Sequence, residues 1–210
     1  MNRRLRHPPM QADFDAINFA SAPPSRPLPA IRLADARYAS QFYVNPTSRL
    51  TPISGAFPCV YLGLTKQTAI CEVMGDKFYL TRTRKLAVHA IASRHAQRLG
   101  FLKTPLPALN LCNWTDPGMR LSSGIDSSAI MALNFKITRT WAERVARHPA
   151  NFDGICYRSR HTDEPCLVLW LRPGGRRLDR ELNFSDAGAF LSSPDAYAAA
   201  ARCQVRLAFI

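Results

Sequence analysis

Polar side chains that bind anions or stabilise charge occur where short apolar runs of this sequence begin or end. They comprise four arginines, a tyrosine, a glutamate and a serine: Arg32, Arg49, Tyr61, Glu72, Arg158, Ser159 and Arg160. Arginine suits phosphate oxygens because its planar fork donates two parallel hydrogen bonds. The sequence contains neither GxGxxG nor GxxxxGKS/T. A nucleotide would therefore have to be held by side chains rather than by a glycine-rich loop.

The segment 56–74 predicts how two of these side chains are positioned. Residues 59–64 form an apolar run that favours a strand, and apolar residues recur at helical spacing after Thr65. Thr65 is a suitable N-cap because its hydroxyl can accept a bond from a free amide of the first turn. Glu72 lies about two turns further on, too far from the free amides of the first turn for them to account for a carboxylate at this position. We expect Tyr61 on the strand and Glu72 on the helix to face one cavity.

The rest of the chain alternates strand and helix patterns, which indicates the α/β class. Strands are predicted over 85–92, 108–114, 152–160, 166–171 and 204–210, and helices over 126–133, 138–147 and 194–202. Residues 1–29 are rich in proline and arginine and are predicted to be an N-terminal arm, with a helical turn at 14–19. Residues 30–210 are then predicted to be one domain.

Composition narrows the class of protein. The formal charge of +13 attracts polyanions, whether nucleic acid, a dinucleotide or an acidic protein. No helix-turn-helix, zinc-finger or RNP signature is present, so a primary role in binding nucleic acid is not expected. No apolar run reaches about 18 residues and no signal-peptide core follows the first arginines, which predicts a soluble, cytoplasmic protein. The six cysteines are scattered singly without metal-ligand spacing, so no metal is expected.

The order of several short motifs resembles the RES-domain family, which is named after Arg, Glu and Ser. The motifs are Val60-Tyr61-Leu62, Thr68-Ala69-Ile70-Cys71-Glu72, Trp141-Ala142 and Asp153-Gly154-Ile155-Cys156-Tyr157-Arg158-Ser159-Arg160, the last preceding an apolar strand. Proteins of this family are NAD+-degrading toxins of bacterial toxin–antitoxin pairs. The resemblance implies a single domain with a mixed, split sheet similar to the ADP-ribosyltransferase toxin fold.

The resemblance also implies which residues act. Glu72, Arg49 and Ser159 would be catalytic, and Arg32, Arg49, Tyr61 and Ser159 would bind NAD+ as the substrate. Serine and leucine flank Arg49, where family members usually have glycine and an aromatic residue, so either Arg32 or Arg49 can be the essential arginine. Glu72 would stabilise the positive charge that builds on the ribose as nicotinamide leaves. The acceptor can be water or phosphate.

The resemblance implies a cognate Xre-like antitoxin as partner, acidic at the contact surface, in an oligomeric toxin–antitoxin complex. Contact with nucleic acid would come through the antitoxin, and no membrane is involved. Two alternatives remain open. One is an ADP-ribosyltransferase that modifies a macromolecule. The other is a non-enzymatic basic module that binds nucleic acid, for which bulk charge is the supporting feature.

Overall fold

The computed structural model describes residues 7–19, 30–35, 42–80, 85–87, 97–102, 109–127, 130, 135–182, 184–189, 194–202 and 206–208. Its strands are β1 (Ile31–Asp35), β2 (Cys59–Gly63), β3 (Lys85–Ala87), β4 (Gln97–Leu102), β5 (Leu111–Asn113), β6 (Gly154–Arg158), β7 (Pro165–Trp170), β8 (Phe184–Ala189) and β9 (Arg206–Ala208). Its helices are α1 (Gln11–Asp15), α2 (Lys66–Leu80), α4 (Pro117–Ser123), α6 (Phe135–Ala146), α7 (Leu178–Glu181) and α8 (Pro194–Arg202).

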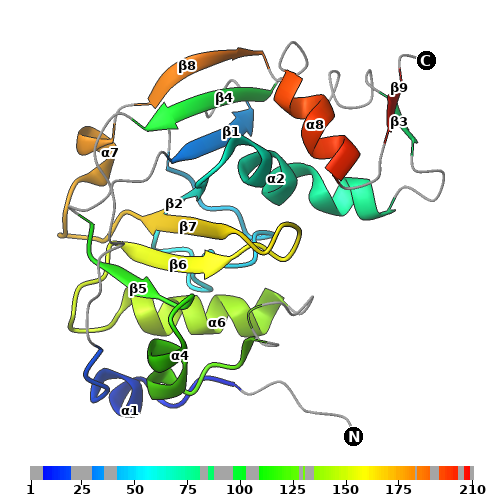
Figure 1. The fold of residues 1–210 in the computed structure, drawn as a ribbon. Coiled ribbons are helices and arrows are strands. Elements are labelled where there is room, and N and C mark those ends of the chain that lie inside the picture. The colour runs from blue at the N-terminus through cyan, green and yellow to red at the C-terminus, as the bar shows by residue number, and fades with distance from the viewer. Residues whose placement is uncertain are drawn as a thin grey trace, which may run out of the picture.

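The central feature is a mixed sheet that divides into two halves (Figure 1). Seven strands follow the order β5-β6-β7-β2-β1-β4-β8, with β5 parallel to β6 and the other neighbours antiparallel. Strands β2 and β7 pair along their length, as do β1 and β4. The two halves meet at β1 and β2, which share the register pair Ile31 with Gly63. This architecture confirms the expected mixed, split α/β sheet.

The apolar core on one face of the sheet is built by α6 and β5–β7. Helix α6 buries Trp141, Ala142 and Val145 along one stripe, and the inward residues of β6 and β7 pack in the same cluster. Trp170 also donates its indole N–H to the Phe152 carbonyl at 2.9 Å. In Figure 1, α1, α4 and α6 lie together at this end of the molecule. This packing fixes the position of β6 relative to α6.

Part of the segment expected as an arm belongs to this core. Phe14 on α1 is fully buried, and its ring centroid lies 6.0 Å from that of Trp141 and 5.4 Å from that of Phe19. The helical turn spans Gln11–Asp15 rather than 14–19. Residues 1–6 and 20–29 lie outside the described part, and the boundary at residue 29 stays a prediction. Burial of two phenylalanines explains why residues 11–19 are held despite the flanking prolines.

Several elements match their predicted ranges closely, and others were missed. Helix α8 spans 194–202 as predicted, whereas α6 begins at 135 instead of 138. The strands predicted over 85–92 and 204–210 are described only at 85–87 and 206–208, and the helix predicted over 126–133 lies mostly outside the described residues. Strands β1, β4 and β8 were not predicted. The sequence FSDAGA of β8 has low strand propensity, so pairing with β4 decides its conformation.

Helix α4 occupies a segment whose residues Asp116-Pro117-Gly118 and Ser122-Ser123-Gly124 also favour a polar loop. The Asp116 side chain accepts a bond from the Met119 amide at 2.7 Å, Pro117 occupies the first turn, and Gly124 ends the helix at φ 73°. Asp followed by Pro is an N-terminal helix signal as well as a turn signal. The sequence pattern was therefore ambiguous, and burial of Met119 favours the helix.

Membrane-spanning helices and clusters of metal-ligating side chains are both absent from the described ranges. No helix there combines the length and apolar character needed to cross a membrane. The same residues contain no group of three or more His, Cys, Asp or Glu side chains that could hold a metal ion. The five cysteines that are described, Cys59, Cys71, Cys112, Cys156 and Cys166, are buried, and none of them forms a disulfide with another described residue.

Candidate functional site

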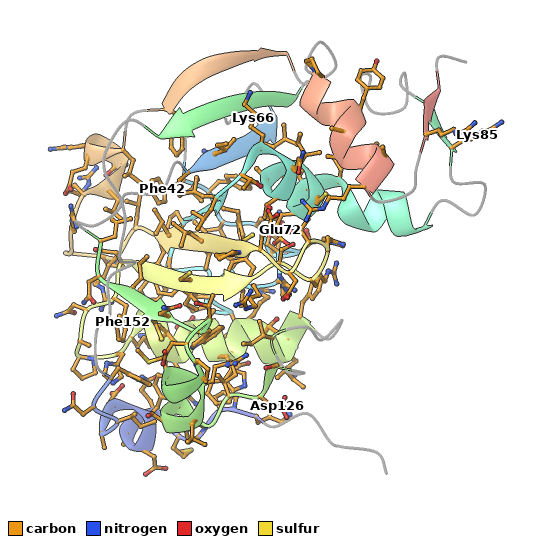
Figure 2. The ribbon with its side chains drawn as sticks, in the orientation of Figure 1. Phe42, Lys66, Glu72, Lys85, Asp126 and Phe152 are labelled. Atoms are coloured by element: carbon orange, nitrogen blue, oxygen red, sulfur yellow. The ribbon has the colours of Figure 1, made fainter. Side chains whose placement is uncertain are left out.

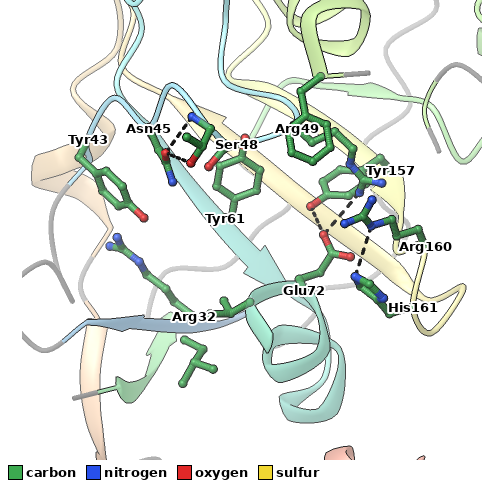
Figure 3. Close-up of a pocket in the computed structure, with 14 residues that line it drawn as sticks. Arg32, Tyr43, Asn45, Ser48, Arg49, Tyr61, Glu72, Tyr157, Arg160 and His161 are labelled. Carbon is green, nitrogen blue, oxygen red and sulfur yellow. Dashed lines mark hydrogen bonds and ion pairs between the residues drawn. The ribbon is translucent and has the colours of Figure 1, made fainter. Parts of the chain in front are cut away.

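A cavity of about 240 Å³ opens where the two halves of the sheet separate. After the pair Ile31 with Gly63, β1 and β2 diverge, and Leu33 and Tyr61 line the gap instead of pairing with each other. The remaining lining residues come from β1, the loop 42–49, α2, the start of α6, and β6 with its following turn: Arg32, Tyr43, Asn45, Thr47, Ser48, Arg49, Glu72, Val73, Phe135, Tyr157, Arg160 and His161. Figure 3 shows this cavity. The split in the sheet therefore creates the site.

Glu72 is held at one end of the cavity by three side chains. Tyr157 donates its hydroxyl to Oε2 at 2.7 Å, and Ser159 donates to Oε1 at 2.7 Å. Arg49 Nη2 lies 3.5 Å from Oε2, and the Glu72 side chain is 14% exposed. Figure 2 shows Glu72 between α2 and the ends of β6 and β7. Each carboxylate oxygen thus has a fixed donor, which sets the orientation of the charge.

Helix α2 places Glu72 there, and its first turn is fixed by the turn after β6. Thr65 Oγ1 accepts the Thr68 amide at 3.1 Å, which confirms the predicted N-cap. Both threonine hydroxyls also donate to Glu164, and Arg202 Nη1 of α8 lies 3.0 Å from the same carboxylate. The Thr68 hydroxyl is the largest cause of a lowered pKa at Glu164, and Thr65 and Arg202 add to it. This network ties α2 to the segment that carries Ser159.

Arg49 lies against Glu72, and one nitrogen of its guanidinium group makes no hydrogen bond to the described residues. Its side chain is 8% exposed, and its Cζ lies 5.2 Å from the centroid of the Tyr157 ring. Nη1 is buried and has no hydrogen-bond partner among the described residues. A buried guanidinium donor without an acceptor is unfavourable, because it has lost water and gained nothing. The arrangement fits a ligand that brings an anionic oxygen to this point.

Tyr61 supports the loop that carries Arg49. Its hydroxyl accepts the Leu50 amide at 3.0 Å and lies 3.2 Å from Thr51 Oγ1, while its ring forms part of the cavity wall. Burial raises the pKa of Tyr61 above its ordinary value, and the charge of Arg49 opposes this shift only weakly. Tyr61 therefore stays neutral and contributes shape and hydrogen bonding.

Ser159 lies behind Glu72 rather than on the cavity wall. The residue is completely buried, and its hydroxyl accepts the His161 amide at 3.1 Å and the Thr162 amide at 3.3 Å while donating to Glu72. Its hydrogen-bonding capacity is used within the protein. The structure thus brings Ser159 to Glu72 at the site that the family resemblance implied, but in a position that orients the carboxylate rather than one that lines the cavity.

Arg32 lines the opposite end of the cavity from Glu72 (Figure 3). Its Cζ lies 5.8 Å from the Tyr43 ring centroid and 5.7 Å from that of Phe184, and the residue is 3% exposed. Burial lowers the pKa of Arg32 to about 10, which leaves the guanidinium charged at neutral pH. The two predicted arginines therefore supply positive charge at separate ends of one cavity.

Among the lining residues, Tyr157 and His161 were not singled out from the sequence, and Arg160 was named there without a role at the site. Tyr157 precedes Ser159 by two positions, and this spacing places both on one face of a strand, a signal that could have identified it. Arg160 donates from Nε to His161 Nε2 at 3.3 Å. A Cβ at Gly75 would lie 2.6 Å from the His161 ring, so the glycine on α2 admits this imidazole. Arg158, by contrast, points to the Asp163 carbonyl at 2.8 Å and does not line the cavity.

The arrangement combines one oriented carboxylate with cations at both ends of an open cavity. The carboxylate can stabilise positive charge on a bound group, and the guanidinium groups can hold anionic oxygens. The volume is below the range of about 300–1,000 Å³ that is typical of complete ligand pockets. A ligand with two linked halves would therefore place one half beside Glu72 and extend past the cavity mouth.

Comparisons with known proteins agree with this architecture. A chain of the crystal structure of the M. tuberculosis MbcT–MbcA toxin–antitoxin complex matches with a TM-score of 0.55 and 17% sequence identity, over 76% of this chain and 83% of that chain. At this identity the likeness concerns the fold. Comparison with curated protein sequences finds no match. The RES domain profile matches residues 11–190, which is most of the chain. The protein therefore belongs to the RES domain family.

Proposed function

We propose that this protein is an NAD+-degrading toxin of a toxin–antitoxin pair and that it cleaves the bond between nicotinamide and ribose. The observation that carries the proposal is the Glu72 carboxylate, which is oriented by Tyr157 and Ser159 at 2.7 Å each and lies beside Arg49 in the cavity. Family membership and the fold of the MbcT–MbcA match support it.

The reaction breaks the C1′–N bond, and the electron pair stays with the pyridine nitrogen, so the pyridinium leaves as neutral nicotinamide. Positive charge builds on the ribose as the bond lengthens. Glu72 stabilises this charge, and the interaction strengthens in the transition state. Water or inorganic phosphate then forms the new bond to C1′; water releases a proton, and phosphate gives ADP-ribose 1″-phosphate.

Other residues bind and orient. Arg49 offers its Nη1 donor to the diphosphate, and Arg32 supplies positive charge at the other end of the cavity. Tyr61 forms the wall against the nicotinamide riboside. Ser159 and Tyr157 act through Glu72 as positioning residues, because both hydroxyls donate to its carboxylate. The described residues offer no metal cluster, and the bond cleavage proposed here requires none.

The partner in this proposal is an Xre-like antitoxin whose acidic surface meets this basic chain of charge +13 and covers the cavity. The toxin would act in the cytoplasm, where both the antitoxin and NAD+ are present.

The test replaces Glu72 by glutamine, which removes the charge and keeps the shape. We expect nicotinamide release from NAD+ to fall by about 100-fold or more. Glu181→Gln on α7 is the matched control, since that carboxylate pairs with Arg176 outside the cavity. Retained turnover in Glu72→Gln would reject the role of Glu72.

Adenylate-labelled NAD+ distinguishes the alternative reaction. Label transferred to a macromolecule would favour an ADP-ribosyltransferase. Adding the antitoxin should stop release, and an unchanged rate would contradict inhibition by cavity covering.

A further inference from the structure

The loop that carries Arg49 is fixed by polar side chains of α6. Residues 46–54 form turns and bends without regular helix or strand. Thr138 Oγ1 donates to the Arg49 carbonyl at 2.6 Å. Arg139 donates from Nη1 to the Pro46 carbonyl at 2.7 Å and from Nε to the Thr51 carbonyl at 3.0 Å. One helix therefore binds the loop on both sides of Arg49.

A fourth attachment fixes the end of the loop. Glu143 Oε2 accepts the Ser54 amide at 3.2 Å and the Ser54 hydroxyl at 2.8 Å. Its other oxygen accepts from Arg147, which directly follows the end of α6. Glu143 is a buried carboxylate within the apolar surroundings of α6. A charge is kept in such a place only where it is hydrogen-bonded, and here Ser54 of the loop and Arg147 provide those bonds.

Thr138 has an equally unusual place. It is 1% exposed and shares the buried face of α6 with Trp141, Ala142 and Val145, where an apolar residue would be expected. Its hydroxyl is the group on α6 that reaches the Arg49 backbone. The next amide along the chain, that of Leu50, is held by the Tyr61 hydroxyl at 3.0 Å. The backbone on both sides of the Arg49 side chain is thus fixed from two different elements.

We infer that Thr138, Arg139 and Glu143 are positioning residues that hold the loop 46–54 and thereby keep the Arg49 guanidinium against Glu72 and Tyr157. This inference rests on the proposed function. The Arg49 guanidinium stands 3.5 Å from Glu72 and stacks on Tyr157, so a small shift of its backbone moves its free donor away from the ligand. A misplacement of about 1 Å can reduce a rate by about 100-fold.

The test compares two threonine-to-valine variants on the same helix. Thr138→Val removes the hydroxyl that reaches Arg49, whereas Thr140→Val removes one that donates to the Lys136 carbonyl at 2.7 Å within the helix. We expect kcat per folded molecule to fall at least about tenfold in Thr138→Val and to stay unchanged in Thr140→Val. Thr138→Ser keeps the hydroxyl and should recover most of the activity. A purely structural role would lower only the melting temperature.

A second readout does not require turnover. Amide hydrogen exchange in peptides covering 46–54 reports the loop directly, because the Leu50 and Ser54 amides take part in its attachments. Exchange should be faster in Thr138→Val than in Thr140→Val. Unchanged kcat in Thr138→Val of an active protein would overturn the inference, and so would unchanged exchange. If the wild-type protein released no nicotinamide, the proposed function would fail, and exchange alone would decide whether α6 restrains the loop.

Discussion

Replacing Tyr157 by phenylalanine tests whether the orientation of Glu72 matters separately from its charge. The change removes the hydroxyl that donates to Oε2 at 2.7 Å and keeps the ring under Arg49. Burial is the main cause that raises the pKa of Tyr157 well above its ordinary value, and the nearby Glu72 charge adds to it. The hydroxyl therefore donates throughout the accessible pH range, and the effect of its loss should not depend on pH near neutrality.

The size of the effect follows from the other donors at the carboxylate. A hydrogen bond to a charged group contributes about 1.5–3 kcal/mol. Ser159 still holds Oε1 at 2.7 Å and Arg49 stays 3.5 Å from Oε2, so the lower end of that range applies. About 1.4 kcal/mol corresponds to tenfold in rate. We therefore expect kcat to fall about tenfold with little change in KM, because no group that faces the substrate is lost.

The assay is the initial rate of nicotinamide release over a range of NAD+ concentrations, with thermal unfolding measured on the same samples. Tyr197→Phe is the matched control, since Tyr197 lies on α8 and is 38% exposed. Full kcat in Tyr157→Phe would refute the view that this hydroxyl orients Glu72. A large rise in KM at unchanged kcat would mean that Tyr157 binds the substrate directly.

Two further predictions concern the supports of α2. Because the pKa of Glu164 is lowered in the folded protein, chiefly by the Thr68 hydroxyl, its contribution to stability is complete above the unfolded value of 4.5 and is lost as pH falls through the lower folded value. Urea unfolding between pH 7 and pH 3 should thus show a smaller loss of stability for Glu164→Gln than for the wild type, and parallel curves would contradict this. Gly75→Ala places a Cβ 2.6 Å from the His161 ring and should destabilise by about 1–3 kcal/mol. A gain in stability, as expected for alanine in an unobstructed helix, would show that the ring moves freely.

The candidate site illustrates which parts could be predicted. The pairing of Tyr61 and Glu72 across one cavity was predicted from a strand followed by a capped helix, and the structure confirms it. The family resemblance also implied that Ser159 belongs to this site. It did not predict that this hydroxyl lies behind Glu72, or that Tyr157 is the second donor. Those contacts link residues 85 and 87 positions apart, and local periodicity contains no information on such distances.

The loop of Arg49 shows the same limit. Its sequence predicts turns, but nothing local indicates that Thr138 and Glu143 of a distant helix would hold it. The buried polar residues on α6 could have served as a signal, since a threonine in an apolar stripe needs a partner. The identity of that partner depends on how α6 packs against the sheet.

By itself, the sequence determined the local elements and the chemistry available to them. Side-chain type and spacing predict the strand over 59–64, the N-cap at Thr65 and the buried strand over 166–171, and they show that arginines and a glutamate are available near the strand ends. Only the tertiary structure decided that β1 and β2 separate after one pair and open a cavity there. Periodicity acts over a few residues, whereas the pairing of β1 with β4 and the packing of α2 across the split depend on contacts between distant segments.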